Sequence, residues 1–106
     1  MRKIIILLTL LCTVIVTKAQ TEKSLQQITK EVMEQACVQY TNMASNLGKG
    51  RVPRSFSKDR LITSDIYWWC SGFYTGTLWY LYEYTGSEKI KKLACTYTDM
   101  LAPLQY

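Results

Sequence analysis

The stretch from Trp68 to Gly86 constrains the fold of this chain most, because it is rich in aromatic residues and contains a single charged side chain, Glu83. Small residues at several positions interrupt the strict alternation that a half-buried strand requires. Gly72 and Gly76 are four residues apart, so on a helix they share one smooth face that another backbone can approach closely. A helix that is apolar on nearly every side is a buried one. We therefore expect a buried helix that ends at Gly86.

Amphipathic helices are predicted on both sides of this buried helix. Ser24 caps the first, Gln27 completes a capping box, and Gly48 ends the helix. Ser87 caps the second, and Pro103 ends it. Apolar residues in both recur at steps of three and four, the period of one helical face. The first stripe contains Leu25, Ile28, Val32, Ala36, Tyr40, Met43 and Leu47, and the second contains Ile90, Leu93, Ala94, Tyr97, Met100 and Leu101.

Residues 48–67 connect the first two predicted helices and show no sustained period, so we expect a long loop there. Loops of more than about 12–15 residues in compact domains are often functional. Five basic side chains gather in this segment: Lys49, Arg51, Arg54, Lys58 and Arg60. Such a cluster is typical of a solvated loop, and the alternative is a surface that meets acidic or sulfated sugars.

Residues 1–19 are predicted to be a secretory signal peptide. Two basic residues precede an apolar run over residues 4–16, and Thr17 and Ala19 are the small residues of a cleavage site after Ala19. As a helix the run reaches about 20 Å, short of the ~30 Å hydrocarbon core, so a retained anchor is the weaker interpretation. A lipoprotein modified at Cys12 is weaker still, because Leu11 is large. We expect export to the periplasm or the exterior, with no stable membrane span after cleavage.

Removal of the signal peptide changes what the charge implies. The whole chain carries a net charge of +5, whereas residues 20–106 hold 10 basic and 8 acidic side chains. No nucleic-acid partner is expected, because these basic residues lie on no obvious recognition element. The chain contains no histidine, which excludes His-based catalytic triads and His-ligated zinc. No spacing resembles a metal site, so we expect neither a metal nor a cofactor.

Three cysteines follow the predicted cleavage site: Cys37, Cys70 and Cys95. An odd number cannot all pair within one chain, but export makes one disulfide possible. The alternative is that all three are small hydrophobic residues in helix interfaces.

The predicted fold is all-α, with an outer helix, a long loop, a buried helix and another outer helix. A buried helix needs neighbours around its whole circumference, and two amphipathic helices cover only part of it. We therefore expect residues 20–106 to be the N-terminal fragment of a helical barrel. The alternative is a small three-helix bundle with an unusually apolar middle helix.

Two segments resemble the N-terminal signature of a known family. Pro53-Arg54-Ser55 and residues 69–88, which read WCSGFYTGTLWYLYEYTGSE, are similar to glycoside hydrolase family 88, the unsaturated glucuronyl hydrolases. The resemblance covers roughly residues 24–106. It implies an (α/α)6 barrel, of which this chain contains the N-terminal helices of the six-hairpin domain.

The resemblance also implies an activity. Such enzymes release 4,5-unsaturated uronic acid from the non-reducing end of oligosaccharides that lyases produce from glycosaminoglycans. An aspartic acid protonates C4 of the enol ether, water adds at C5, and the resulting hemiketal opens; no metal takes part. The family's essential aspartates are expected after Tyr106, and we assign no catalytic residue within this chain, which we expect to be inactive alone. The acids in and around the matched segments, Asp59, Asp65, Glu83 and Asp99, occupy no position of the catalytic motif.

The one binding residue that the resemblance implies is Trp69, whose counterpart stacks on the sugar. An indole face packs well against sugar C–H bonds; the alternative is that Trp69 is a core or capping aromatic. The family commonly has aspartate where this chain has Trp68, and often an acid where it has Ser71. Two other functions stay open: a secreted non-catalytic helical binding module, and a related unsaturated rhamnogalacturonyl hydrolase.

Overall fold

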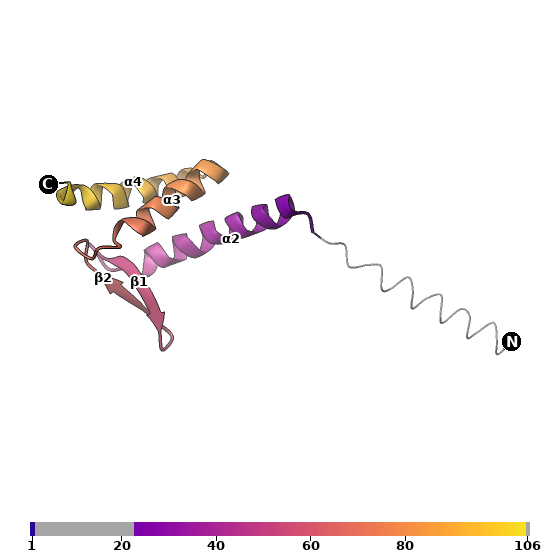
Figure 1. Cartoon of the computed structure of the whole chain (residues 1–106), viewed down its shortest axis with the longest axis horizontal. Coiled ribbons are helices and arrows are strands. Elements are labelled where there is room, and N and C mark those ends of the chain that lie inside the picture. The colour runs from indigo at the N-terminus through magenta and orange to yellow at the C-terminus, as the bar shows by residue number, and fades with distance from the viewer. Residues whose placement is uncertain (2–22, 106) are drawn as a thin grey trace.

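The described part of the chain is mostly helical, with three α-helices and one antiparallel hairpin of two strands (Figure 1). The computed structural model describes residue 1 and residues 23–105. Except for Met1, the predicted signal peptide lies outside the described residues. The elements are α2 (Leu25–Asn46), β1 (Val52–Ser57), β2 (Arg60–Ser64), α3 (Gly72–Thr85), α4 (Glu88–Leu101) and a 3-10 turn, η1 (Ala102–Leu104).

Helix α2 begins where the sequence predicts it. The Ser24 hydroxyl accepts a hydrogen bond from the backbone N–H of Gln27 at 3.2 Å, which satisfies one of the free donors of the first turn. The reciprocal bond of the capping box, from Ser24 N–H to the Gln27 side-chain oxygen, is not formed, and the Gln27 side-chain amide donates to Glu31 at 3.4 Å. The helix ends at Asn46, with Leu47 as its C-cap.

Helices α3 and α4 form a tight pair, and the predicted end of α3 at Gly86 and start of α4 at Ser87 are confirmed. Gly86 has a φ of 67°, a left-handed conformation that glycine adopts without a steric penalty. Its N–H donates to Tyr82 O at 2.7 Å, and the chain turns directly into α4. The Ser87 hydroxyl then accepts from Ile90 N–H at 3.4 Å, which caps α4 as predicted.

The core lies between the three helices, with α3 at its centre. Its buried residues come from α3 and α4, and the C-terminal half of α2 packs against them. The Tyr74 ring stacks on Tyr40 of α2 with centroids 5.3 Å apart, and it meets Tyr97 of α4 edge-on at 4.8 Å. The Tyr74 hydroxyl donates to Tyr40 O at 2.8 Å, so one side chain connects all three helices. The buried members are Tyr74, Leu78, Leu81, Ile90, Ala94 and Tyr97.

The hairpin corrects the prediction of a long loop over residues 48–67. Val52 pairs with Ser64 at the open end and Ser57 with Arg60 at the turn. Lys58 and Asp59 both have positive φ, 49° and 57°, as a type I′ two-residue turn requires. The strands are too short to show a sustained alternation, and Lys-Asp is not the Asn-Gly or Asp-Gly pair that signals such a turn. The all-α prediction therefore omitted this element.

The prediction that α3 is buried on every side is wrong within residues 23–105. Phe73 and Tyr80 are each 72% exposed and Tyr84 is 51% exposed, although α3 is the most apolar of the described helices. A Cβ atom added at Gly72 or Gly76 would meet no atom within 4 Å, so the expected close backbone approach is not made. Helices α2 and α4 cover only one side of α3, and the described residues form no toroid.

Candidate functional site

Trp69, the predicted sugar-stacking residue, lies in the turn between the hairpin and α3 and is 86% exposed. Asp65 begins this turn, because its carboxylate accepts from Tyr67 N–H at 3.0 Å. Ser71 N–H then donates to Trp68 O at 2.8 Å, which fixes the backbone on both sides of the two tryptophans. The indole of Trp69 is open to solvent and takes no part in the core that the three helices form.

Trp68, the neighbouring indole, is half-buried and meets a cation. The guanidinium carbon of Arg54 lies 5.7 Å from the centroid of the Trp68 ring, within the ~6 Å range of a cation–π contact. The sequence predicts a loop at Arg54, and Trp68 stands where the resembled family commonly has aspartate. The structure brings the two together from segments 14 positions apart.

A β-bulge sets the position of Arg54. Pro53 pairs with Thr63 and Ser55 pairs with Ile62, so Arg54 is the extra residue of β1 that has no partner in β2. A bulge of this kind bends its strand and re-aims a side chain, and bulges are frequent next to functional sites. Nothing in the sequence marks a bulge at this position, which is why the site was missed.

Arg54 and Trp68 line a cavity of about 200 Å³ between α2, the hairpin and the start of α3. Its wall is aromatic and apolar, with one positive charge. The lining residues are Tyr40, Met43, Pro53, Arg54, Trp68, Cys70, Phe73, Tyr74 and Thr77. Burial, together with the neighbouring Tyr97 and Tyr40, raises the pKa of Tyr74 well above its usual range, so this hydroxyl stays protonated as a donor.

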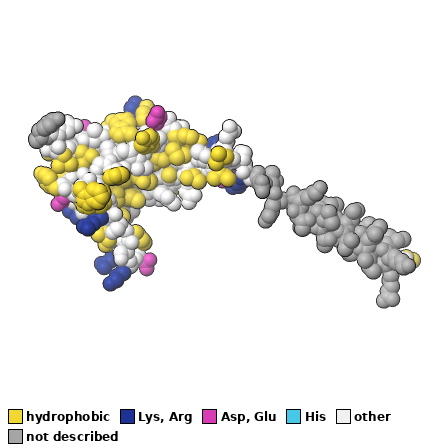
Figure 2. Space-filling model, viewed as in Figure 1, with side chains coloured by type: hydrophobic (Ala, Val, Ile, Leu, Met, Phe, Trp, Pro, Cys, Tyr) yellow, Lys and Arg dark blue, Asp and Glu magenta, His cyan; other side chains and the backbone are white. Residues whose placement is uncertain are grey.

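The predicted basic cluster is dispersed by the hairpin. Arg51 is used internally, because its guanidinium donates to Thr63 Oγ1 at 3.1 Å and to Thr63 O at 2.8 Å. Lys58 and Arg60 lie at the far turn, where Figure 2 shows basic side chains at the tip of the hairpin. Arg54 is the member of the cluster that meets the aromatic cavity.

The acids that sequence analysis named do not converge on either tryptophan. Asp59 lies in the hairpin turn, and Asp65 caps the turn before the tryptophans. Glu83 is exposed on α3, and Asp99 of α4 lines a separate cavity beside Leu47. A carboxylic acid that donates a proton at neutral pH normally has its pKa raised by burial. All four are exposed, so we assign none of them a catalytic role.

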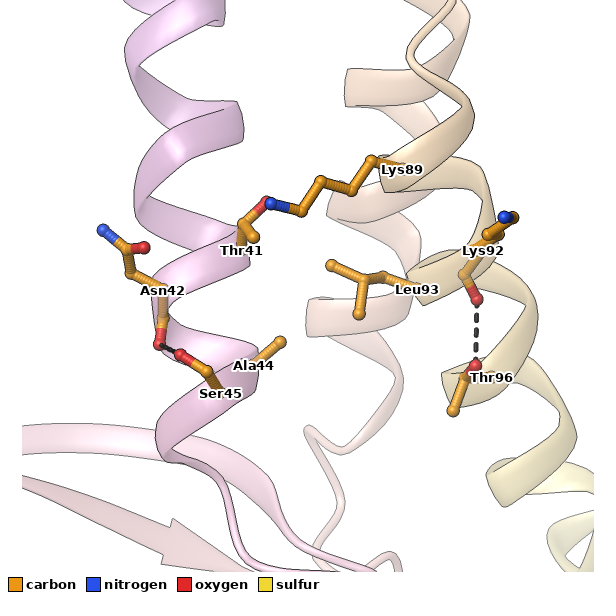
Figure 3. A pocket seen from close by; sticks show the side chains of 8 residues that line it. All are labelled: Thr41, Asn42, Ala44, Ser45, Lys89, Lys92, Leu93 and Thr96. Carbon is orange, nitrogen blue, oxygen red and sulfur yellow. Dashed lines mark hydrogen bonds between the residues drawn. The ribbon is translucent and has the colours of Figure 1, made fainter.

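An open groove of about 560 Å³ runs between α2 and α4 (Figure 3). Two of its hydroxyl groups already bond to their own helices: Ser45 to Asn42 O at 2.7 Å, and Thr96 to Lys92 O at 2.9 Å. Leu93 projects between the helices in the same view. The groove therefore offers few free polar groups that converge on one point, and it is a weaker candidate than the Arg54 cavity. Its wall is formed by Thr41, Asn42, Ala44, Ser45, Lys89, Lys92, Leu93 and Thr96.

The three cysteines after the predicted cleavage site are free thiols in this structure. Cys37 packs in the interface between α2 and α3, where its Sγ lies 3.9 Å from Thr85 Oγ1. Cys70 lines the Arg54 cavity, and Cys95 is exposed on α4, so the alternative of three interface cysteines fails for Cys95. Within residues 23–105, no group of three or more cysteine or acidic side chains is placed to hold a metal ion.

Comparison of the chain with protein-family models, curated proteins and solved structures finds no match. No helix in the described part of the chain combines the length and apolar character needed to cross a bilayer.

Proposed function

We propose that this chain contributes the N-terminal helices of an exported (α/α)6-barrel hydrolase that removes 4,5-unsaturated uronic acid from lyase-generated oligosaccharides. The sequence resemblance over residues 69–88 motivates the proposal. The observation that carries it is the exposure of Trp69, 86% of whose surface is open to solvent at the entrance to α3.

An exposed indole is costly unless something covers it. Burial of a large aromatic side chain is worth about 1.5–3 kcal/mol relative to exposure. The backbone bonds around Asp65 and Ser71 hold Trp69 in a defined turn. A sugar stacked on this ring removes apolar surface from water without requiring the turn to rearrange, which is the role that we propose for Trp69.

The barrel in this proposal is supported by the uncovered side of α3. Phe73, Tyr80 and Tyr84 expose three aromatic rings on one helix, and apolar patches larger than a few hundred Å² usually mark an interaction surface. Further helices of the barrel would cover these rings, and the open space at Gly72 and Gly76 would admit a close helix crossing.

The chemistry of the proposed reaction needs a proton donor at C4 and a water at C5. General acid catalysis typically contributes about 10²–10⁴-fold, and positioning contributes up to about 7–11 kcal/mol. The acids near the tryptophans supply neither, so we propose that Trp69 binds sugar and that the proton donor lies elsewhere in the hydrolase. We expect no turnover by the 106-residue chain alone.

The test compares the 106-residue chain with the longer hydrolase that the proposal requires, on unsaturated chondroitin, heparin and rhamnogalacturonan disaccharides. Loss of the double bond's ultraviolet absorbance measures hydration. We expect turnover of a glucuronyl disaccharide by the longer hydrolase alone, and a KM about tenfold higher for its Trp69→Ala variant, equivalent to about 1.4 kcal/mol. Tyr67→Ala is the matched control, because Tyr67 is 77% exposed in the same turn.

Each outcome of this test has a defined meaning. Absence of turnover with every disaccharide contradicts the hydrolase. Turnover of the rhamnogalacturonan disaccharide alone favours the related rhamnogalacturonyl hydrolase. Equal KM values for Trp69→Ala and Tyr67→Ala contradict the stacking role.

A non-catalytic glycan-binding module is the second candidate. It is favoured by the same exposed Trp69, because the four acids named above are all exposed and none converges on this indole. Binding of an unsaturated disaccharide that depends on Trp69, without loss of its double bond, would establish this candidate instead of the hydrolase.

A further inference from the structure

We propose that the cavity beside Arg54 and Trp68 binds the carboxylate of an acidic sugar, with the sugar ring against the aromatic wall. This binding site is distinct from the stacking surface of Trp69. It does not require the hydrolase activity, because binding at Arg54 needs no catalytic acid.

The charge of Arg54 is uncompensated in the structure. The ion pairs found within residues 23–105 join Lys23 to Glu31, Lys30 to Glu34, and Lys91 to Glu88, and none involves Arg54. A guanidinium presents a planar fork of N–H donors that matches both oxygens of a carboxylate. Contact with Trp68 restrains the fork, so less rotamer entropy is lost when an anion binds.

The bulge is a second observation that points to a ligand. Arg54 stands outside the pairing of β1 with β2, so its side chain is not needed for the register of the hairpin. Arg51, by contrast, donates twice to Thr63 across the strands. Arg51, which precedes β1, therefore stabilises the hairpin, whereas Arg54 in β1 lines the cavity.

The lining and the volume of the cavity indicate the chemical class and the size of its ligand. Sites for drug-sized ligands usually enclose about 300–1,000 Å³, whereas this one is about 200 Å³, which suits a single monosaccharide ring. Tyr40, Trp68 and Phe73 give the lining an aromatic surface suited to sugar C–H bonds, and the one positive charge selects a sugar that carries a carboxylate. A hexuronate has both features.

Saturation-transfer difference NMR on the full chain tests the site, because the method tolerates protein that self-associates. The observed probes are D-glucuronate and neutral D-glucose, and inorganic sulfate, which has no protons to observe, is added as a competitor of glucuronate. We expect saturable transfer to glucuronate and none to glucose. Arg54→Gln should weaken glucuronate binding about tenfold, or about 1.4 kcal/mol. Arg60→Gln is the matched control, because it removes the same charge from the far turn of the hairpin and should leave the affinity unchanged.

A second variant keeps the proposal testable if Arg54→Gln disturbs the hairpin, which circular dichroism would detect. Arg54→Lys keeps the charge but lacks the planar fork, and it should also weaken glucuronate binding. Equal affinities for wild type and both Arg54 variants, absence of glucuronate binding, or equal affinity for glucose overturns the proposal. Displacement of glucuronate by equal concentrations of inorganic sulfate also overturns it, because the site then recognises a bare anion.

Failure of this site and failure of the hydrolase are distinguishable. Turnover of a disaccharide by protein whose glucuronate binding is independent of Arg54 would leave the hydrolase in place and remove this site. Arg54-dependent binding of glucuronate without turnover would do the reverse.

Discussion

The two sides of α3 are similar in composition and opposite in environment. Leu78 and Leu81 on one side are almost completely buried, whereas Phe73 and Tyr80 on the other are each 72% exposed. The sequence of α3 therefore shows that the helix favours burial, but not which of its sides is covered. The apolar stripe of α4 determines the covered side, because Ile90 and Ala94 share the core cluster with Leu78 and Leu81.

The two halves of α2 differ for the same reason. Tyr40 and Met43 in its C-terminal half pack on the core, while Leu25 and Val32 in its N-terminal half are exposed. Figure 1 shows the N-terminal end of α2 projecting past α3 and α4. A 22-residue helix is about 33 Å long and a 14-residue helix about 21 Å. The apolar stripe of α2 therefore extends beyond the end of α3, and its N-terminal residues have no helix to pack against within the described residues.

The largest expected effect concerns the open side of α3. We predict that residues 20–106 expressed alone self-associate, and that the triple variant Phe73→Ser/Tyr80→Ser/Tyr84→Ser is monomeric. Each ring loses about 1.5–3 kcal/mol of favourable burial when it stays in water, so three rings contribute about 4.5–9 kcal/mol, a range that includes the roughly 8.2 kcal/mol of a complex with micromolar affinity. Analytical ultracentrifugation measures the change.

The control for this prediction replaces apolar residues that lie away from α3. Leu25→Ser/Val38→Ser alters two exposed residues of α2 and should leave the association of the chain unchanged. A wild-type chain that sediments as a monomer with a sharp two-state melting transition contradicts the prediction.

The next effect compares the buried and exposed sides directly. Leu78→Ala should lower the free energy of unfolding by about 2–5 kcal/mol, because it leaves a cavity between α3 and α4. Tyr80→Ala removes a larger side chain but should change stability by less than about 0.5 kcal/mol, as exposed positions usually do. Urea unfolding measured at a protein concentration low enough to keep the chain monomeric compares them. Equal losses would show that the exposed side of α3 is packed in the monomer.

Most of the helical architecture could be predicted because its signals are local. Ser24 and Ser87 cap helices where the sequence indicates, and Gly86 provides the left-handed turn. The hairpin could not be predicted in the same way. Its strands have five or six residues, and its turn uses Lys58 and Asp59, whose positive φ angles are uncommon for residues other than glycine.

In the candidate site, too, one part could be predicted from the sequence and the other could not. Trp69 could be named from a continuous stretch of sequence, and the structure places its indole in solvent. The Arg54–Trp68 contact joins separate segments, and it depends on the bulge that frees Arg54 from pairing. A single sequence contains no signal for a register shift of one residue, so this contact required the structure.

An intermediate effect concerns pH, because Tyr74 is buried and the ordinary tyrosine pKa is 10.0. Burial raises the pKa of Tyr74 in the folded state, so the contribution of Tyr74 to stability is constant below pH 10.0 and decreases as the pH rises above it. Tyr74→Phe should reduce this decrease, and it should cost about 0.5–1.5 kcal/mol at neutral pH because the hydrogen bond to Tyr40 is lost.

Tyr80→Phe provides the control for the alkaline effect, because the hydroxyl of Tyr80 is on the exposed side of α3. Urea unfolding between pH 8 and 11 should give parallel curves for wild type and Tyr80→Phe and a flatter curve for Tyr74→Phe. Identical curves for all three proteins would mean that Tyr74 ionises as freely in the folded state as in the unfolded one.

The smallest effect compares equivalent caps in packed and unpacked surroundings. Ser87 and Ser24 each accept a backbone hydrogen bond, from Ile90 N–H at 3.4 Å and from Gln27 N–H at 3.2 Å. Loss of such a cap costs about 1 kcal/mol of helix stability. Ile90 is buried in the core, so Ser87→Ala should lower the global free energy of unfolding by this amount.

The first turns of α2 have few tertiary contacts and can fray separately, so Ser24→Ala should change the global value by less than about 0.5 kcal/mol. It should instead increase hydrogen exchange in residues 25–32 alone. Equal global losses for the two variants would show that the N-terminal half of α2 is packed against a partner in solution, and that the difference between its two halves disappears there.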